Sequence, residues 1–226
     1  MVGNNSELIG YDEEQVQMMT ENCIVVDEND QILGYDSKIN CHLGEGKLHR
    51  AFSVLLFNSK NELLIQKRAS EKITFPAIWA NSCCSHPLYL DKEKNDISGA
   101  RNAAKRKMEQ ELGINGKEIK LNKLHFITKM HYKARADSKW IEHEIDYIFV
   151  IKEDLETRPN KNEIEKTMYI NKIDLDQFFS EAKIKNNKIG PWFRHIKENF
   201  LDSIWNNIEN LDNIKDEKIH YMEELQ

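Results

Sequence analysis

A single amphipathic helix, expected at residues 98–112, sets the architecture that this sequence predicts. Ser98 or Asp96 can cap its first turn, and Gly113 is placed to end it. Its apolar face consists of residues at helical spacing, namely Ala103, Ala104, Met108 and Leu112. Short strand-like segments lie on both sides of this helix, so the pattern predicts one domain of the α+β class.

Short apolar runs separated by turn residues indicate the strands. Before the helix, hairpins are expected at 23–27 with 31–35 and at 51–57 with 62–68. After it, strands are expected at 124–133, 140–152 and 167–170. Residues 36–50 are polar, contain two glycines and are expected to form a loop.

The end of the chain is expected to be helical. Pro191 suits a first helical position, and apolar residues then recur at helical spacing: Trp192, Ile196, Phe200, Ile204 and Ile208. Residues 1–20 are polar, with a weak helical patch at 13–19, and are expected to lie over the surface. We therefore predict an N-terminal extension at 1–20 and a single domain at 21–226 with an added C-terminal helical segment.

Composition argues against several classes of function. The 226 residues are 40% hydrophobic and 31% charged, which is typical of a globular protein. A net charge of −6 argues against nucleic-acid binding, and no run approaches the ~18 apolar residues of a membrane span. The termini match no targeting signal, and the four cysteines form no CxxC pair. We expect reduced thiols in a cytoplasmic protein, with the peroxisome as the alternative.

Residues 79–87, Trp-Ala-Asn-Ser-Cys-Cys-Ser-His-Pro, concentrate reactive side chains. If the segment is extended, Cys84 and His86 point to one face, and Cys83 and Ser85 to the other. A thiol beside an imidazole can be a metal-binding pair, a nucleophile with its base, or two buried side chains. These residues alone leave the three interpretations open.

Two carboxylates define a second candidate site. On a strand, Glu142 and Glu144 project from the same face and repel one another unless water or a cation lies between them. His42, His49 and His86 are candidate partners, and together the five form a nitrogen and oxygen shell suited to zinc, manganese or a similar divalent ion. The alternative is a solvated strand edge.

Three cations lead into the same region of the sequence. Lys38 precedes the first of these histidines, while Arg68 and Lys72 follow the second hairpin. In an acidic chain, such a group suggests a local anion pocket, for example one for phosphates. A solvated rim is the alternative interpretation.

The predicted helix carries a more specific string. Residues 106–114 resemble the end of a Nudix box, with Arg, Met, Glu, Gly and Ile at the matching positions. Lys107 and Gln110 stand where that pattern has Glu, and Lys92 and Ser98 stand where it has Gly and Glu. The missing carboxylates are magnesium ligands of Nudix hydrolases, so the resemblance implies the fold without the hydrolytic activity.

From about residue 20 onward, the sequence resembles the type I isopentenyl-diphosphate delta-isomerases, and their eukaryotic members most. The matching strings, in the family's order, are Lys38…His42…His49-Arg-Ala-Phe, Arg68-Ala-Ser-Glu-Lys72, residues 81–87, Glu111-Leu-Gly113, His131-Tyr132 and Glu142-His-Glu144. The resemblance implies a Nudix-like mixed sheet with flanking helices, an α/β sandwich. It also implies interconversion of isopentenyl and dimethylallyl diphosphate through a tertiary carbocation, a step of isoprenoid and sterol biosynthesis.

The same resemblance implies roles for individual residues. Cys84 and Glu144 would be the acid and base groups on opposite faces of the substrate, with Tyr132 assisting Glu144. Trp192 would give the cation an aromatic face. The phosphates would be held by Lys38, Arg68, Lys72 and Ser85. One divalent metal (zinc, manganese or magnesium) would be bound by His42, His49, His86, Glu142 and Glu144.

Glu111 is implied as the ligand of a second ion, a magnesium that arrives with the diphosphate. At Lys107 many relatives carry Arg. The expected partner is a small allylic or homoallylic diphosphate, and the protein is expected to be a monomer. The alternatives are a Nudix-type diphosphate hydrolase acting on nucleotides and a non-catalytic, metal-stabilised binding domain, in which nothing would require Cys84.

Overall fold

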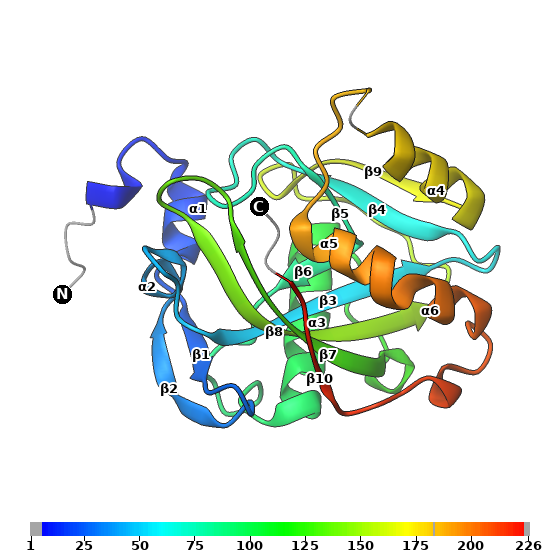
Figure 1. The fold of residues 1–226 in the computed structure, drawn as a ribbon, viewed down its shortest axis with the longest axis horizontal. Coiled ribbons are helices and arrows are strands. Elements are labelled where there is room, and N and C mark those ends of the chain that lie inside the picture. Colours follow the sequence, from blue (N-terminus) through cyan, green and yellow to red (C-terminus); the bar gives the residue numbers. More distant parts are fainter. Residues whose placement is uncertain (1–5, 183, 224–226) are drawn as a thin grey trace.

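The computed structural model describes residues 6–182 and 184–223, and its centre is a mixed β-sheet (Figure 1). The strands are β1 (Asn22–Val26), β2 (Ile32–Ser37), β3 (His49–Phe57), β4 (Leu63–Arg68), β5 (Trp79–Ala80), β6 (Cys83–Ser85), β7 (His125–Arg135), β8 (Ile141–Lys152), β9 (Ile164–Ile170) and β10 (Ile219–Tyr221). The helices are α1 (Glu13–Met18), α2 (Lys38–His42), α3 (Asp96–Leu112), α4 (Lys172–Glu181), α5 (Pro191–Ile196) and α6 (Asp202–Asn206). A π-helical turn, Lys197–Leu201, joins α5 to α6.

The sheet is built around the pairing of β3 with β8. These strands run parallel, in a register from His49 opposite Glu144 to Phe57 opposite Lys152. The path of the sheet is β10-β7-β8-β3-β1-β2, with β6 and β4 also pairing with β3, and β5 and β9 with β4. All nine residues of β3 are buried, which explains why the strand reads as a nearly continuous apolar run.

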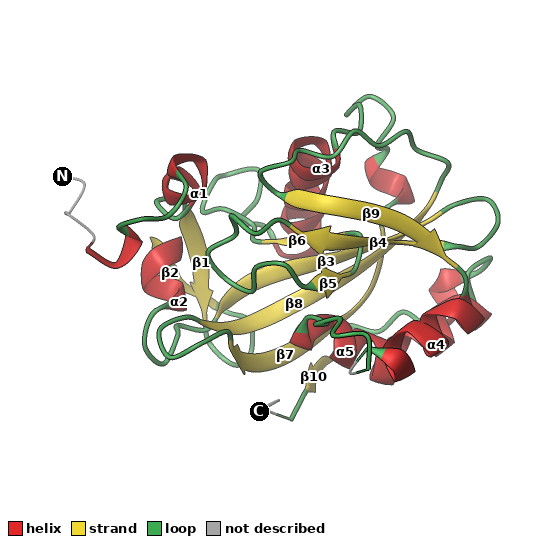
Figure 2. Cartoon of the chain, turned by 90° about the horizontal axis from the view of Figure 1, so that it is seen from above, coloured by secondary structure: helices red, strands yellow, loops and turns green. Residues whose placement is uncertain are grey.

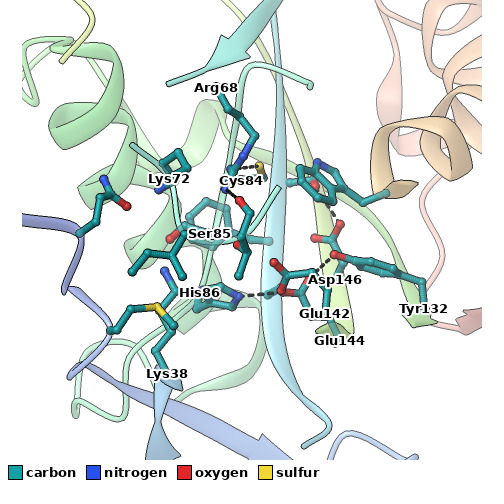
Figure 3. A pocket seen from close by; sticks show the side chains of 18 residues that line it. Lys38, Arg68, Lys72, Cys84, Ser85, His86, Tyr132, Glu142, Glu144 and Asp146 are labelled. Atoms are coloured by element: carbon teal, nitrogen blue, oxygen red, sulfur yellow. Dashed lines mark hydrogen bonds and ion pairs between the residues drawn. The ribbon is translucent and has the colours of Figure 1, made fainter. Parts of the chain in front are cut away.

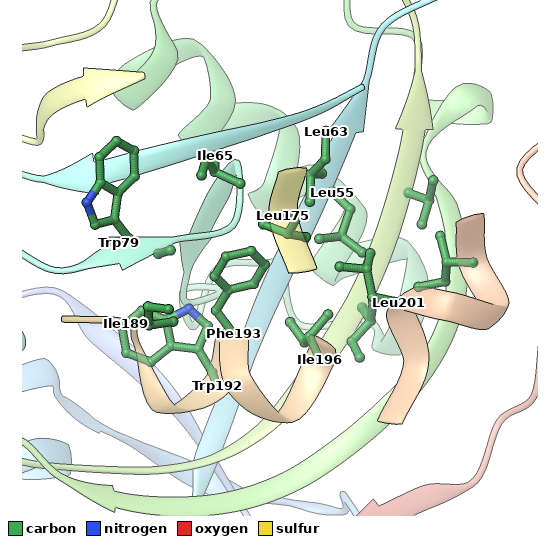
Figure 4. Close-up of a cluster of buried hydrophobic side chains, with 14 of the residues drawn as sticks. Leu55, Leu63, Ile65, Trp79, Leu175, Ile189, Trp192, Phe193, Ile196 and Leu201 are labelled. Carbon is green, nitrogen blue, oxygen red and sulfur yellow. The ribbon is translucent and has the colours of Figure 1, made fainter. Parts of the chain in front are cut away.

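The two faces of the sheet are covered by helices from different parts of the chain. Helix α3 covers one face, and α5 and α6 lie on the other (Figure 2). Along β3 the side chains alternate between the two cores: Val54 and Leu56 join the cluster with α3, and Leu55 and Phe57 join the cluster with α5 and α6. Figure 4 shows this second cluster, in which the C-terminal helices contribute Trp192, Phe193, Ile196 and Leu201. The predicted α/β sandwich is therefore confirmed.

The central helix is confirmed, but its predicted cap is wrong. Helix α3 begins at Asp96, with Asn95 as an N-cap that makes no side-chain capping bond, and Ser98 lies inside the helix. The carboxylate of Asp96 accepts instead from the Tyr147 hydroxyl at 2.7 Å. The first turn of α3 thus has a tertiary hydrogen bond from Tyr147 in place of the predicted local cap. The C-terminal end is as predicted, with Gly113 in the left-handed region at a φ of 63°.

The predicted hairpins are largely confirmed. β1 with β2 and β7 with β8 form antiparallel pairs. The hairpin at 51–68 differs, because β3 and β4 pair only at Phe57 and Leu63 before β4 turns away to pair with β9. The expected loop at 36–50 is also wrong in part, since it contains α2. A helix of five residues is too short to show a period, and this one depends on the Ser37 cap.

The described part of the N-terminal segment lies largely over the surface, as expected, but a few buried side chains attach it to the domain. Gln15 and Met19, from α1 and the residue after it, are each 3% exposed. The amide nitrogen of Gln15 donates to Asn162 Oδ1 at 2.7 Å, which attaches this segment to the loop before β9. Residues 1–5 of the predicted extension, and 224–226 of the C-terminus, lie outside the described residues. Across the helices that are described, no apolar stretch is long enough to cross a bilayer.

The end of α3 generates a stability prediction. At Gly113 an added Cβ would lie 2.1 Å from the Arg158 carbonyl oxygen, whereas at Gly44, with a similar φ of 66°, nothing lies within 4 Å. Gly44→Ala should lower the free energy of unfolding by about 1–2 kcal/mol, because alanine is strained in the left-handed region. Gly113→Ala should lower the free energy of unfolding by the same amount and by about 1–3 kcal/mol more, because the added Cβ clashes with the Arg158 carbonyl. Urea unfolding of both variants measures the difference, and equal losses would contradict the clash.

Candidate active site

Most of the side chains singled out from the sequence line one pocket at the edge of β3 and β8 (Figure 3). The sequence-predicted residues among them are Lys38, Arg68, Lys72, Cys84, Ser85, His86, Tyr132, Glu142, Glu144 and Trp192. His42 and His49 are fully buried and contact Glu142 and Glu144. Glu111 is not among these residues. The structure thus brings together side chains from α2, from the five strands β3, β4, β6, β7 and β8, from two loops and from α5.

Strand β6 separates the two neighbouring cysteines. It pairs antiparallel with β3, so that Cys84 lies opposite Ser53. Cys83 is fully buried on the α3 side, with its Sγ 3.7 Å from Glu111 Oε2, while Cys84 lines the pocket, as the alternation predicts. Ser85, the last residue of β6, lines the pocket too, contrary to the alternation.

The three histidines and two glutamates form a compact buried cluster. Their ligand atoms all lie within 4.8 Å of one another. The three imidazole rings have centroids 4.7 to 5.0 Å apart. Each ring is held by a different element: His42 ends α2, His49 begins β3, and His86 directly follows β6. Glu142 and Glu144 share one face of β8, as predicted.

The donor atoms of this cluster suit a divalent cation. His42 Nδ1 donates to the Lys38 carbonyl and His49 Nδ1 to the Lys47 carbonyl, both at 2.7 Å, which leaves their Nε2 lone pairs facing the cluster. His42 Nε2 lies 2.7 Å from Glu142 Oε2, yet neither atom has a hydrogen-bond partner. Two buried acceptors at this separation repel unless a proton or a metal ion lies between them. The residues therefore fit the expected metal.

The charged groups of the cluster shift one another's pKa values. Burial disfavours the charged form of His49, but contacts with Glu144 outweigh it and raise its pKa to about 9. Burial also opposes ionisation of Glu144, yet His49 outweighs it and lowers the pKa of this carboxyl to about 2. Burial, followed by the charge of Lys38, keeps the pKa of His86 well below 6.5. Glu144 is therefore a carboxylate.

Two groups able to transfer protons line the same pocket. Burial raises the pKa of Cys84 to about 12, against the opposing charge of Arg68, so Cys84 is a thiol at neutral pH. Glu144 Oε2 accepts from the Tyr132 hydroxyl at 2.5 Å. Burial and then the charge of Glu144 raise the pKa of Tyr132 well above 10, so this phenol keeps its proton. The pocket thus holds a protonated sulfur and an ionised carboxylate.

An indole ring closes the pocket on the side of α5. Trp192 follows Pro191, which begins this helix, and its indole nitrogen donates to Asn81 Oδ1 at 3.0 Å. The Asn81 amide donates in turn to the carbonyls of Val54 and Cys83, both at 3.1 Å. Asn81 therefore orients the aromatic wall, a role that its place in the 81–87 string did not indicate.

Two cations of the pocket, Arg68 and Lys72, already have partners within the protein. The Arg68 guanidinium donates to the Phe75 and Thr74 carbonyls at 3.0 and 2.9 Å. The loop that wraps it has positive φ angles at Phe75 and Ala77, the kind of strain found at functional sites. Lys72 Nζ lies 2.6 Å from Glu163 Oε2.

The expected second metal ligand lies apart from the histidine cluster. Glu111, on α3, is 3% exposed, and its Oε1 lies 3.1 Å from Lys107 Nζ. Lys107 thus pairs with Glu111, at the position where the Nudix pattern has another carboxylate. The role of Glu111 stays a prediction.

Sequence reasoning missed several residues of the pocket. Asp146 continues the alternation of Glu142 and Glu144, so this spacing could have revealed it; its Oδ2 accepts from Ser53 Oγ at 2.8 Å. Burial and the charge of Glu144 raise its pKa well above 3.8. Glu163, which pairs with the pocket residue Lys72, lies directly before β9 and is brought there by the pairing of β9 with β4, which no local pattern indicates.

The comparisons with known proteins agree with this geometry. A profile of the NUDIX domain matches residues 47–194, more than half of the chain. A Deinococcus radiodurans protein of known structure has a TM-score of 0.55 over 80% of this chain and 99% of its own, at 15% identity. A NUDIX hydrolase from Alicyclobacillus acidocaldarius has a TM-score of 0.53 over 74% and 97%, at 10% identity. The chain is a Nudix-fold protein.

Curated relatives define the family more closely. The isopentenyl-diphosphate Delta-isomerase 1 of Bos taurus is 47% identical over 218 residues, 93% of this chain and 96% of that protein. An isopentenyl-diphosphate delta-isomerase of Gibberella zeae is 46% identical, covering 91% and 84%, and the chloroplastic isomerase I of Arabidopsis thaliana is 44% identical, covering 88% and 72%. The chain belongs to the isopentenyl-diphosphate delta-isomerase family.

Metal binding can be tested at the histidine cluster. His42→Ala should lower the affinity for divalent ions, because it removes a buried ligand, whereas His125→Ala should not, because His125 lies outside the cluster. Binding to the unaltered protein should weaken as the pH falls, because protons compete with the ion for the imidazoles, first for His49, whose pKa is raised to about 9. Metal analysis after dialysis measures both effects. Equal metal content in the two variants would place the ion elsewhere.

Proposed function

We propose that this chain interconverts isopentenyl diphosphate and dimethylallyl diphosphate, with Cys84 and Glu144 as its proton-transfer groups. The observation that carries the assignment is that a protonated thiol and a carboxylate hydrogen-bonded by Tyr132 line one pocket together with an indole ring. By its family, the activity belongs to isoprenoid biosynthesis.

The reaction requires a proton to be added to one carbon and removed from another. Protonation of the double bond at C4 gives a tertiary cation at C3, and loss of a proton from C2 forms the new double bond. Because the reaction is reversible, each of Cys84 and Glu144 acts as acid in one direction and as base in the other. Tyr132 holds the carboxylate of Glu144 in place.

The cation between these steps has to be protected from water. Trp192 is 3% exposed, and its ring can stabilise a positive charge over its face. Asn81 fixes the plane of this ring through the indole nitrogen. The buried walls of the pocket exclude the water that would otherwise capture the cation.

The five-residue cluster would hold one divalent metal, and the predicted ions are zinc, manganese and magnesium. When bound, the ion supplies positive charge that keeps Glu144 ionised and oriented. Lys38, Arg68, Lys72 and Ser85 would bind the diphosphate, with a magnesium ion at Glu111. The monomeric state and the compartment also stay predictions.

A Nudix-type diphosphate hydrolase is the alternative function. Lys107 counts against it, because an ammonium group occupies the neighbourhood of Glu111 where a further magnesium carboxylate would be needed. Incubation with isopentenyl diphosphate and, separately, with a nucleoside diphosphate derivative distinguishes the two. Isomerisation of the first without cleavage of the second is expected.

The two cysteines provide a matched pair of variants. Cys84→Ala should lower turnover by roughly 10²–10⁴-fold, the usual contribution of an acid or base. Cys83→Ala should keep most of the activity, because Cys83 lies on the α3 side, outside the pocket. Turnover of isopentenyl diphosphate is the measurement. An equal loss in both variants would exclude Cys84 as a proton-transfer group.

The two strand carboxylates test the role of Glu144. Glu144→Gln keeps the shape but cannot take a proton at neutral pH, so turnover should be nearly lost while the diphosphate still binds. Glu142→Gln should mainly weaken the metal, so excess metal should restore part of its activity. The measurement is turnover across a metal titration, with solvent deuterium incorporation as the readout of proton transfer. Rescue of Glu144→Gln by metal alone would show that Glu144 is only a ligand.

A further inference from the structure

Glu163 forms a buried ion pair with Lys72, a residue that lines the proposed diphosphate pocket. Its Oε2 lies 2.6 Å from Lys72 Nζ, and the two side chains are only 4% and 10% exposed. Lys72 belongs to the loop after β4, and Glu163 precedes β9. The backbone holds these segments together, because Ala69 N donates to the Glu163 carbonyl at 3.0 Å.

The second oxygen of this carboxylate is also occupied. Gln15, from α1, donates its amide to Glu163 Oε1 at 3.1 Å and to Asn162 Oδ1 at 2.7 Å. The carboxylate therefore receives one donor on each oxygen, one from the N-terminal helix and one from Lys72. This arrangement fixes the direction in which the Lys72 ammonium points.

The charge of Lys72 depends on its surroundings. Burial lowers its pKa to about 8, and the nearby charges of Arg68 and Lys38 act in the same direction, while Glu163 and Glu111 oppose them. Burial opposes ionisation of Glu163, but Lys72 and Lys107 outweigh it and hold its pKa far below 4.5. Glu163 is thus an anion at every physiological pH, whereas Lys72 loses its proton as the pH rises through about 8.

We propose that Glu163 is a positioning residue that keeps Lys72 charged and directed at the substrate diphosphate. This inference rests on the proposed function, because it assumes that the pocket binds a diphosphate. A neutral amine binds a diphosphate much more weakly than an ammonium group, which makes a charge-assisted hydrogen bond. Without its carboxylate partner, the buried lysine would be neutral over much of the working pH range.

The test compares the unaltered protein with Glu163→Gln. Calorimetry measures the binding of inorganic diphosphate with Mg²⁺, from about pH 6.5 to about pH 9.5. At about pH 7.5, below the pKa of about 8 that Lys72 has beside Glu163, the variant should bind about 10- to 100-fold more weakly, the loss expected for one charged hydrogen bond. Toward about pH 9.5 the difference should narrow, because Lys72 is neutral there in both proteins. With isopentenyl diphosphate, KM should change more than kcat.

Two further variants distinguish a positioning role of Glu163 from a purely structural one. Adding Lys72→Arg to Glu163→Gln should restore most of the binding at about pH 7.5, because a guanidinium stays charged. Glu165→Gln is the matched control: Glu165 pairs with Lys67 at 2.8 Å across the same two strands, outside the pocket, and its loss should leave the pH dependence unchanged.

An equal loss of diphosphate affinity at every pH, without recovery when Lys72→Arg is added, would overturn the proposal. Glu163 would then only stabilise the local structure. Unchanged binding in Glu163→Gln would also overturn it. If that variant does not fold, Lys72→Arg alone is decisive, because it must remove the fall in binding above about pH 8. If diphosphate binds as expected but isopentenyl diphosphate is not converted, the proposed function fails while the role of Glu163 stands.

Discussion

The parallel pairing of β3 with β8 is the constraint on which the active pocket depends. It sets His49 opposite Glu144 and places Glu142 within reach of His42. The alternation along β8 then directs Glu142, Glu144 and Asp146 to one face. Every other contribution to the pocket is attached to this pair of strands, including β6 with Cys84 and α5 with Trp192. A shift of one residue in the register would turn the carboxylates away from the histidines.

Much of this arrangement can be predicted from the sequence, because local patterns specify it. The period of α3, the glycine that ends it and the hairpins on either side all follow from short-range rules. The separation of Cys83 from Cys84 follows from strand alternation. Even the metal cluster follows in outline, because two carboxylates on one strand face need a cation. The family strings then indicated which histidines would meet them.

The rest could not be predicted, because it depends on contacts between distant segments. Glu163 meets Lys72 only after β9 pairs with β4, and Gln15 reaches Glu163 only through the docking of α1. The N-terminal end of α3 depends on Tyr147 rather than on a local cap. In each case a tertiary partner satisfies a group that the local sequence leaves unsatisfied.

The parallel register also has a consequence for the order of events during synthesis. Ser53 and Asp146, which hydrogen-bond across β3 and β8, are 93 positions apart in the chain. All three imidazoles therefore leave the ribosome well before either carboxylate. The cluster able to hold an ion cannot form until β8 has been made and paired, a slow step for strands so far apart. A chain truncated before β8 would therefore retain the three histidines without the carboxylates that complete the cluster.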